Sequence, residues 1–452
     1  MASEMDFDIL VSNGTLVTVN AGFDIIENGA VGIKDGRIAY AGSLSKLSGR
    51  KGAAYLDAAG GLIMPGLVNA HIHLPMSLFR GLADDLALEQ WLNNHIFPAE
   101  QQHLTPETVK WAALLSCSEM LLSGTTTCCD GYFYEDAVAE AVSHTGMRAV
   151  LGQGVIDFPA PGVPDPKDNI RCASAFVEKW KNRSPLISPA IFCHSAYTCS
   201  KETLLSAKAA AKQENVLFQV HVAETQNEPA LIGLPPGTSP VAYLDSLGVL
   251  DENTLAVHAV WAGAEDIDIL AKRNVKICHT PESNMKLASG IAPVPEMLDA
   301  GLVVGLGTDG CASNNNLDMF SEMGTAARLH KGALNDPTVM SAETVIRMAT
   351  IEGARAIGLE HLIGSLEAGK KADLIVIDTR KPHLFPLYHP HSHIVYAARG
   401  ADVRHVMVDG RLLVSDYRLA HLDSEDVIAN VNAIAGNIKF TDRCEGGCRE
   451  EG

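Results

Sequence analysis

The chain has 452 residues, of which 47% are hydrophobic and 20% are charged. These values are typical of a compact globular protein and exclude a fibrous or largely disordered chain. The 54 acidic residues outnumber the 35 basic ones and give a formal net charge of −19, so we expect no nucleic-acid partner and no membrane partner. The first residues lack the basic start and apolar stretch of a secretory signal, and no apolar run reaches membrane-spanning length. The sequence therefore predicts a cytoplasmic protein.

Short β-rich runs, separated by turns that contain Gly or Asp, begin the chain, as in DILVSNGTLVTV and AVGIKDGRIAYAG. This pattern is typical of antiparallel hairpins. Similar runs return near the end, as in ADLIVIDT and VRHVMVDGRLLV. We therefore predict that residues 1–60 and 365–420 form one small β-sandwich domain, and that residues 421–452 form a C-terminal helix and tail.

Between these segments, residues 61–364 alternate short apolar strands with amphipathic helical stretches, which is the pattern of parallel βα units. Eight strands can be placed, from LIMPGLVNAHIH to LVVGLGTDG. The length of the region suits a TIM barrel, which typically takes ~250 residues and upward. The predicted fold class is α/β: a (β/α)₈ TIM barrel with a small β-sandwich domain built from the N- and C-terminal segments.

One helix is expected over TPETVKWAALLSCSEMLLSG, because Thr105 precedes Pro106 as a helix cap and Gly124 ends the stretch. The segment from about 74 to 104, between the first barrel strand and this helix, is unusually long. Long connections of this kind are often lids or substrate loops. We expect the segment to arch over the barrel mouth.

Ten cysteines occur at irregular positions, and several, such as Cys193 and Cys278, lie in apolar strand-like runs. Such cysteines are more often reduced core residues than a disulfide framework. Cys444 and Cys448 lie in a tail rich in Gly and charge, where an exposed disordered end is expected rather than a metal site.

Polar residues gather at the C-terminal ends of the predicted strands, where barrel enzymes build their sites. His71 and His73 are two apart in a strand, so both imidazoles should face the barrel interior. His221 and Asp309 end two other strands and would complete a site for a first-row divalent ion, with a position left for water. Any one of the 17 histidines alone is better explained as a hydrogen-bonded core or surface residue. Four ligand-type residues at the same end of four strands favour a metal site.

The segments NAHIHLPMSLFRG, HVAETQNE, HTPESNMKLASGIAPV and GLGTDGCASNNNLDMFSE resemble the amidohydrolase superfamily, and within it the deaminases of methylthioadenosine and S-adenosylhomocysteine. The resemblance covers nearly the whole chain. It implies a single divalent metal ion, zinc ahead of iron(II), on His71, His73, His221 and Asp309. Binuclear members carry a bridging carboxylated lysine on the fourth strand, and ISPAIFCHSAY contains no lysine, so one ion per chain is expected.

The resemblance also implies the reaction, which is hydrolytic deamination at C6 of an aminopurine. Glu224 would act as proton shuttle between the water and N1 of the ring. His258 would hold the hydrolytic water, and Asp309 would help to stabilise it and to protonate the departing ammonia. The alternative for Glu224 is a surface acid at the start of a loop.

Four substrate contacts follow from the same resemblance. Glu100 could accept hydrogen bonds from the ribose hydroxyls, and His194 could bond a purine ring nitrogen. Trp91 could cover the apolar 5′ portion, although a helix residue packed under the lid is nearly as good an explanation. Ser313 is the weakest candidate. The expected partner is a small-molecule nucleoside of the adenosine type, and a homo-oligomer, either a dimer or a tetramer, is also expected.

Two other functions stay open. A related aminohydrolase or chlorohydrolase acting on triazines, guanine or another heterocycle would use the same single metal site, although the presence of Glu224 favours deamination. The third possibility, an inactive scaffold of the same fold, is disfavoured because every ligand position is filled. The unrelated zinc deaminase fold is excluded, since no P-C-x-x-C motif occurs in the chain.

Recognition of S-adenosylhomocysteine should require an arginine near the third strand to pair with the amino-acid carboxylate. The chain has Gln153 there, and only Lys167 or Arg171 further along could substitute. We therefore expect a lower kcat/KM for S-adenosylhomocysteine than for methylthioadenosine.

Overall fold

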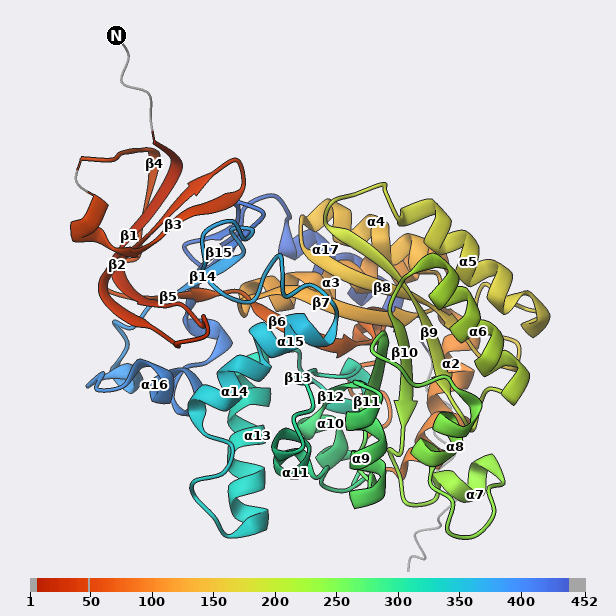
Figure 1. The fold of residues 1–452 in the computed structure, drawn as a ribbon. Coiled ribbons are helices and arrows are strands. Elements are labelled where there is room, and N and C mark those ends of the chain that lie inside the picture. Colours follow the sequence, from red (N-terminus) through yellow and green to blue (C-terminus); the bar gives the residue numbers. More distant parts are fainter. Residues whose placement is uncertain (1–5, 48, 439–452) are drawn as a thin grey trace, which may run out of the picture.

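The computed structural model describes residues 6–47 and 49–438, which form a parallel β-barrel beside a second, mixed β-sheet (Figure 1). The mixed sheet takes its strands from both ends of the chain, so the predicted fold class is confirmed. Cys444 and Cys448 lie outside the described residues. The eight cysteines within them are free, and all but Cys172 are buried.

The barrel consists of eight strands in chain order, and each neighbouring pair is parallel. They are β6 (Leu67–Ile72), β7 (Thr125–Tyr132), β8 (Arg148–Val155), β9 (Ile187–Ser195), β10 (Phe218–Val222), β11 (Thr254–His258), β12 (Lys276–His279) and β13 (Val304–Leu306). Small and branched side chains of several barrel strands, such as Ala70, Ala190 and Val257, form one buried cluster together with residues of the segment 354–363. The interior is therefore a packed core rather than a pore.

The seam between the last strand, β13, and the first, β6, is closed by hydrogen bonds. The backbone N–H of Asp309 donates to the carbonyl of His71 over 3.0 Å. The Asn69 side chain donates to Thr308 Oγ1 over 2.8 Å and accepts from the Thr308 N–H over 3.0 Å. These bonds hold the ends of the first and last barrel strands side by side.

Helices follow the barrel strands and surround them (Figure 1). They are α3 (Pro106–Leu122), α4 (Glu135–Thr145), α5 (Asn169–Trp180), α6 (Lys201–Glu214), α7 (Glu228–Ile232), α8 (Pro240–Leu247), α9 (Ala264–Lys272), α10 (Pro281–Lys286), α11 (Val294–Asp299), α12 (Cys311–Asn314) and α13 (Met319–Leu334). The expected cap of α3 is present, because Thr105 Oγ1 accepts from the Thr108 N–H. None of the helices in the described ranges is long and apolar enough to cross a bilayer.

The mixed sheet joins the two ends of the chain. The first part supplies β1 (Phe7–Val17), β2 (Ile25–Lys34), β3 (Arg37–Ser43), β4 (Gly52–Asp57) and β5 (Leu62–Pro65), and the last part supplies β14 (Leu374–Ile377), β15 (Val403–Val408), β16 (Arg411–Ser415) and β17 (Arg418–Leu419). β5 pairs with β1 on one side and with β14 on the other. A buried ion pair between Arg148 and Asp373, 2.8 Å long, connects the barrel to this sheet.

One expected strand is divided in two. The sequence predicts a continuous strand over LIMPGLVNAHIH, but β5 belongs to the mixed sheet and β6 to the barrel. The division falls at Gly66, where an added Cβ would lie 2.1 Å from Thr126 Oγ1. The chain can pass from one sheet to the other here because glycine leaves room for the β7 side chain.

The remaining elements complete the chain. They are α14 (Ala342–Met348), α15 (Ile351–Ala356), α16 (Pro390–Tyr396) and α17 (Ser424–Ala435), with short 3₁₀ turns at η1 (Leu44–Leu47), η4 (Pro166–Asp168), η5 (Pro382–Leu384) and η6 (Gly400–Asp402). α15 packs against β6 and β13, and α17 packs against α3.

The long connection between β6 and α3 contains four short elements. They are η2 (Leu74–Phe79), α1 (Leu88–Trp91), the π-helical turn η3 (Leu92–Ile96) and α2 (Phe97–His103). Polar contacts fasten this lid segment to segments that follow other barrel strands. Asp84 accepts from Lys286 Nζ over 2.6 Å, and Glu89 accepts from Asn227 Nδ2 over 2.7 Å. The lid segment is therefore tied to the loops after β10 and β12.

Candidate metal centre and active site

Three histidines and one aspartate converge at the C-terminal end of the barrel. One ligand atom from each of His71, His73, His221 and Asp309 lies within 4.8 Å of the others, and all four residues are buried. The Nε2 atom of His71 is 3.1 Å from Nε2 of His221 and 3.5 Å from Oδ1 of Asp309. Nε2 of His73 is 3.3 Å from the same oxygen. The structure thus brings together the four residues that the sequence pattern singled out.

The protonation states of the three histidines suit metal binding. Burial lowers the pKa of His71 to about 4, and it also lowers the pKa of His73 and of His221. All three imidazoles are therefore neutral near pH 7. A metal ligand must offer an unprotonated nitrogen, so this set can bind an ion without first losing protons.

Hydrogen bonds from neighbouring groups orient two of these four side chains. His73 Nδ1 lies 2.7 Å from the carbonyl oxygen of Gly131, so it donates there and Nε2 is left as the acceptor. Asp309 Oδ2 accepts from Ser283 Oγ over 2.6 Å and from Ser313 Oγ over 2.8 Å. These two donors favour the ionised carboxylate and leave Oδ1 to face the histidines.

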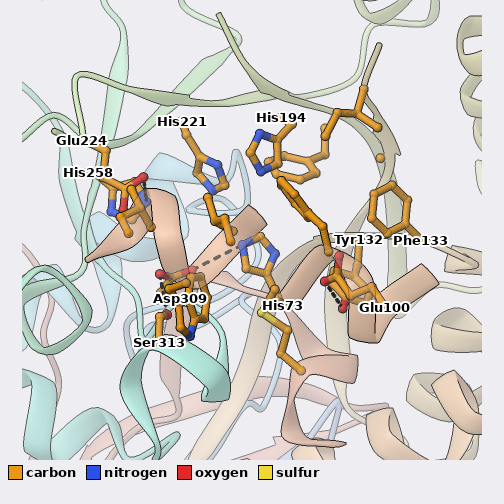
Figure 2. A pocket seen from close by; sticks show the side chains of 18 of the residues that line it. His73, Glu100, Tyr132, Phe133, His194, His221, Glu224, His258, Asp309 and Ser313 are labelled. Carbon is orange, nitrogen blue, oxygen red and sulfur yellow. Dashed lines mark hydrogen bonds and ion pairs between the residues drawn. The ribbon is translucent and has the colours of Figure 1, made fainter. Parts of the chain in front are cut away.

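Glu224 and His258 lie beside the cluster (Figure 2). His258 Nδ1 is 2.9 Å from Asn284 Oδ1, which can only accept, so Nδ1 carries a proton and Nε2 faces the cavity. That Nε2 is 3.8 Å from Glu224 Oε2. Burial raises the pKa of Glu224 above its usual value, which makes it a stronger base than an exposed carboxylate.

Left-handed backbone conformations place several of these side chains. Ala223, His258 and Asp309 have φ of 51°, 74° and 60°. Non-glycine residues rarely adopt such values, which cost of order 1–3 kcal/mol each and cluster at functional sites. The turn at Ala223 is held by Glu228, whose Oε2 accepts from the Glu224 N–H over 2.8 Å.

A cavity opens from this cluster toward the lid segment. The cavity and its mouth together hold about 620 Å³ free of protein atoms. Its lining includes Trp91, Glu100, His194 and Ser313, the four residues predicted to contact a substrate. Burial lowers the pKa of His194 to about 3, so this imidazole is neutral, and its Nδ1 lies 2.9 Å from Thr198 Oγ1.

Glu100 lies on the far side of the cavity from Glu224, His258 and Asp309, with His73 between them in the view of Figure 2. Its carboxyl group accepts a short hydrogen bond from the hydroxyl of Tyr132, the last residue of β7. Burial raises the pKa of Glu100 to about 7. The two carboxyl groups Glu224 and Glu100 thus lie at opposite ends of the cavity, with His73 between them in this view.

The supporting residues were not identified from the sequence. Ser283 and Asn284 lie within HTPESNMK, and Glu228 lies within HVAETQNE, so the segments that carry the resemblance already contained these supporting residues. Tyr132 had no signal beyond its place at the end of a predicted strand. Its contact with Glu100 joins β7 to α2, and such a long-range contact is not visible in a local pattern.

The two basic residues considered as partners for a substrate carboxylate lie elsewhere. Arg171 lines a separate pocket between α4 and α5 and pairs with Asp168 over 3.1 Å. Lys167 lies in η4, and Gln153 lines the same separate pocket as Arg171. The structure therefore brings none of the three to the cavity that holds the histidine cluster.

Comparison with known proteins gives consistent matches over most of the chain. The sequence model of a family described as "Amidohydrolase family" matches residues 62–413. A protein of Syntrophobacter fumaroxidans named 5-methylthioadenosine/S-adenosylhomocysteine deaminase is 48% identical over 96% of this chain and 98% of its own length. A protein of Methanosarcina mazei named 5′-deoxyadenosine deaminase is 44% identical over 95% of this chain and 98% of its own length.

Among solved structures, an adenosine deaminase from Xanthomonas campestris with bound zinc superposes with a TM-score of 0.92. It is 37% identical, and the match covers 95% of this chain and 98% of that one. The similarity extends across both the barrel and the mixed sheet.

Proposed function

Because this chain belongs to the amidohydrolase family, we propose that it is a hydrolytic deaminase that converts the 6-amino group of an adenosine-type nucleoside to the inosine-type product and ammonia. The two-ended cavity is the observation that carries this proposal. Hydrolytic groups occupy one end and the Glu100 carboxyl group the other. A nucleoside has the matching arrangement, because its reactive ring carbon and its ribose diol lie at opposite ends.

The four-residue cluster is proposed to hold one divalent ion, zinc ahead of iron(II). Three neutral imidazole nitrogens and one carboxylate oxygen are a common zinc donor set, and the Ser283 and Ser313 hydroxyls donate to Oδ2 of Asp309 rather than to Oδ1. No lysine occurs in β9 to bridge a second ion. A divalent ion bound here supplies a Lewis acid that lowers the pKa of a water molecule from about 15.7 toward about 7.

The chain's own groups move the protons. Glu224, made more basic by burial, is placed to take a proton from water and to deliver it to N1 of the purine ring. The Nε2 atom of His258 faces the cavity and is proposed to hydrogen-bond to the same water. His194, held by Thr198, is proposed to bond a ring nitrogen and so to align the purine with these groups.

The cavity favours a neutral 5′ substituent. Leu88, Trp91, Leu92 and Phe97 from the lid segment contribute to its lining, and among the described residues no lysine or arginine lines it. A homocysteine carboxylate would therefore lose water without gaining a cationic partner. We propose that 5′-deoxyadenosine and methylthioadenosine are preferred to S-adenosylhomocysteine.

An ammonia-release screen of the purified protein tests the proposal. The panel contains adenosine, 5′-deoxyadenosine, methylthioadenosine, S-adenosylhomocysteine, free adenine, guanine, a pterin and a triazine. We expect the highest kcat/KM for the nucleosides with small or apolar 5′ groups. A preference for guanine or a triazine over every adenosine would contradict the proposal, and equal kcat/KM for S-adenosylhomocysteine and methylthioadenosine would contradict its 5′ specificity alone.

A further inference from the structure

Tyr132 and Glu100 form a polar pair inside an otherwise apolar part of the cavity. Both side chains are about 3% exposed and both line the cavity. Phe97 and Phe133 lie beside them in the same lining. The Tyr132 hydroxyl donates to Glu100 Oε1, and this contact is drawn as a dashed line in Figure 2.

This pair leaves hydrogen-bonding capacity unused. An ionised carboxylate has about four acceptor positions on its two oxygens. Within the described ranges, one protein group, the Tyr132 hydroxyl, donates a hydrogen bond to the Glu100 carboxyl group. A buried carboxyl group with so few donors is costly unless a ligand supplies the rest.

The pair lies apart from the groups that are proposed to carry out the chemical step. Glu224, His258 and Asp309 gather at the opposite side of the cavity in Figure 2. The ring of Tyr132 lies beside that of His73, with 5.9 Å between the ring centres. Tyr132 therefore has a proposed metal ligand, His73, on one side and Glu100 on the other.

We propose that Tyr132 is a positioning residue that holds Glu100 with its second oxygen turned to the cavity, so that the enzyme selects nucleosides with an intact 2′,3′-diol. The inference rests on the proposed function. By occupying Oε1, the tyrosine hydroxyl limits rotation of the carboxyl group and leaves Oε2 as the acceptor for the two vicinal hydroxyls. A sugar without these hydroxyls would leave that oxygen buried and unpaired.

The test compares adenosine with 2′,3′-dideoxyadenosine, in wild-type protein and in Tyr132→Phe. In the wild type we expect kcat/KM for adenosine to exceed that for the dideoxy compound by about a hundredfold, which is the size expected for hydrogen bonds to a charged acceptor. In Tyr132→Phe this ratio should fall about tenfold. The change should appear as a higher KM for adenosine, with kcat within twofold and the dideoxy compound unaffected.

Tyr134→Phe is the matched control, because Tyr134 lines the separate pocket next to α5 and should keep the wild-type ratio. Glu100→Gln should lower the ratio of kcat/KM for adenosine to that for 2′,3′-dideoxyadenosine at least as much as Tyr132→Phe does. The melting temperature and metal content of each variant show whether it is folded.

Three results would overturn the inference. The positioning role would be contradicted if Tyr132→Phe kept the wild-type ratio of kcat/KM for adenosine to kcat/KM for 2′,3′-dideoxyadenosine. It would also be contradicted if the variant lost kcat/KM equally on both substrates. Either result would leave the deaminase proposal in place. Failure of the wild-type protein to deaminate any adenosine would overturn both.

Discussion

The Nε2 atoms of His71 and His73 lie 3.5 and 3.3 Å from Asp309 Oδ1, and His221 Nε2 lies 3.1 Å from His71 Nε2. Loss of one of these ligands should therefore release the ion. We expect close to one transition-metal ion per wild-type chain by elemental analysis, and loss of both ion and activity in His71→Ala. His330→Ala, which removes a buried histidine paired only with His279 among the contacts described, should keep its ion. Two tightly bound ions, or full activity with none, would contradict this assignment.

The role of Glu224 can be separated from metal binding. Glu224→Gln keeps the size and polarity of the side chain but cannot exchange a proton, so we expect kcat to fall by on the order of 10²–10⁴-fold with the metal retained. Glu228→Gln is a matched change four residues along the chain and should keep most of the activity. Near-normal turnover in Glu224→Gln would assign the proton transfer to another group.

The raised pKa of Glu100 predicts a pH effect on substrate choice. Burial raises this pKa from 4.5 to about 7, so the carboxyl group is ionised above about pH 7 and neutral below it. Only the ionised form accepts well from two hydroxyls. The groups that face it are Tyr132, whose pKa burial raises far above its usual value, and His73 beyond the tyrosine ring.

We therefore expect the ratio of kcat/KM for adenosine to that for 2′,3′-dideoxyadenosine to fall as the pH is lowered from 8 to 6. The shared catalytic groups cancel in this ratio. Glu100→Gln should show a flat ratio across the range. A wild-type ratio that rises toward low pH would contradict the assignment.

At the scale of single elements, the turn after β10 positions Glu224, the proposed catalytic carboxylate. Glu228 accepts from the Glu224 N–H and so stabilises the left-handed conformation at Ala223. Glu228→Ala leaves that buried N–H unpaired, at a cost of about 1–3 kcal/mol, and frees the turn. We expect kcat to fall at least tenfold with KM little changed, while Glu228→Gln, which keeps an acceptor oxygen, stays near wild type. Steady-state kinetics of the two variants distinguish this from a loss of folding, in which both would fail.

The elements themselves were largely predictable. Alternation of apolar strands with capped helices indicates a barrel, and the spacing of His71 and His73 indicates a shared face. The break at Gly66 was not predictable, because the residues on both sides are apolar and only the approach of Thr126 requires glycine there. The hydrogen bond between Tyr132 and Glu100 was not predicted for a similar reason, since it depends on how α2 packs against β7.

On the scale of the whole molecule, the barrel and the mixed sheet are joined by the Arg148–Asp373 ion pair, whose side chains are 3% and 1% exposed. Removing one partner leaves a buried charge, which typically costs about 3–5 kcal/mol. We expect Arg148→Met to lower the free energy of unfolding by this amount in urea denaturation, and a second change, Asp373→Leu, to recover part of it. A loss below about 1 kcal/mol in the single variant would show that the pair does not stabilise the junction.

The resemblance predicted from four sequence segments is confirmed by the family match over residues 62–413. Those segments carry residues that share one site although they are far apart in the chain. The oligomeric state stays a prediction, because no local pattern reports it, and sedimentation of the purified protein would test for the expected dimer or tetramer.

The hydrogen bonds between the first and last barrel strands also affect the order in which the protein folds and binds its metal. Asn69 and Thr308 bond to each other across 239 residues of sequence, and they stand next to ligands on the first and last strands. Contacts of such long range form late, because the entropy of closing the loop must first be overcome. During synthesis, a growing chain that has not yet reached Asp309 holds three of the four proposed metal ligands. Tight metal uptake should therefore mark the completion of the barrel, so that metal retention reports complete folding as well as readiness for catalysis.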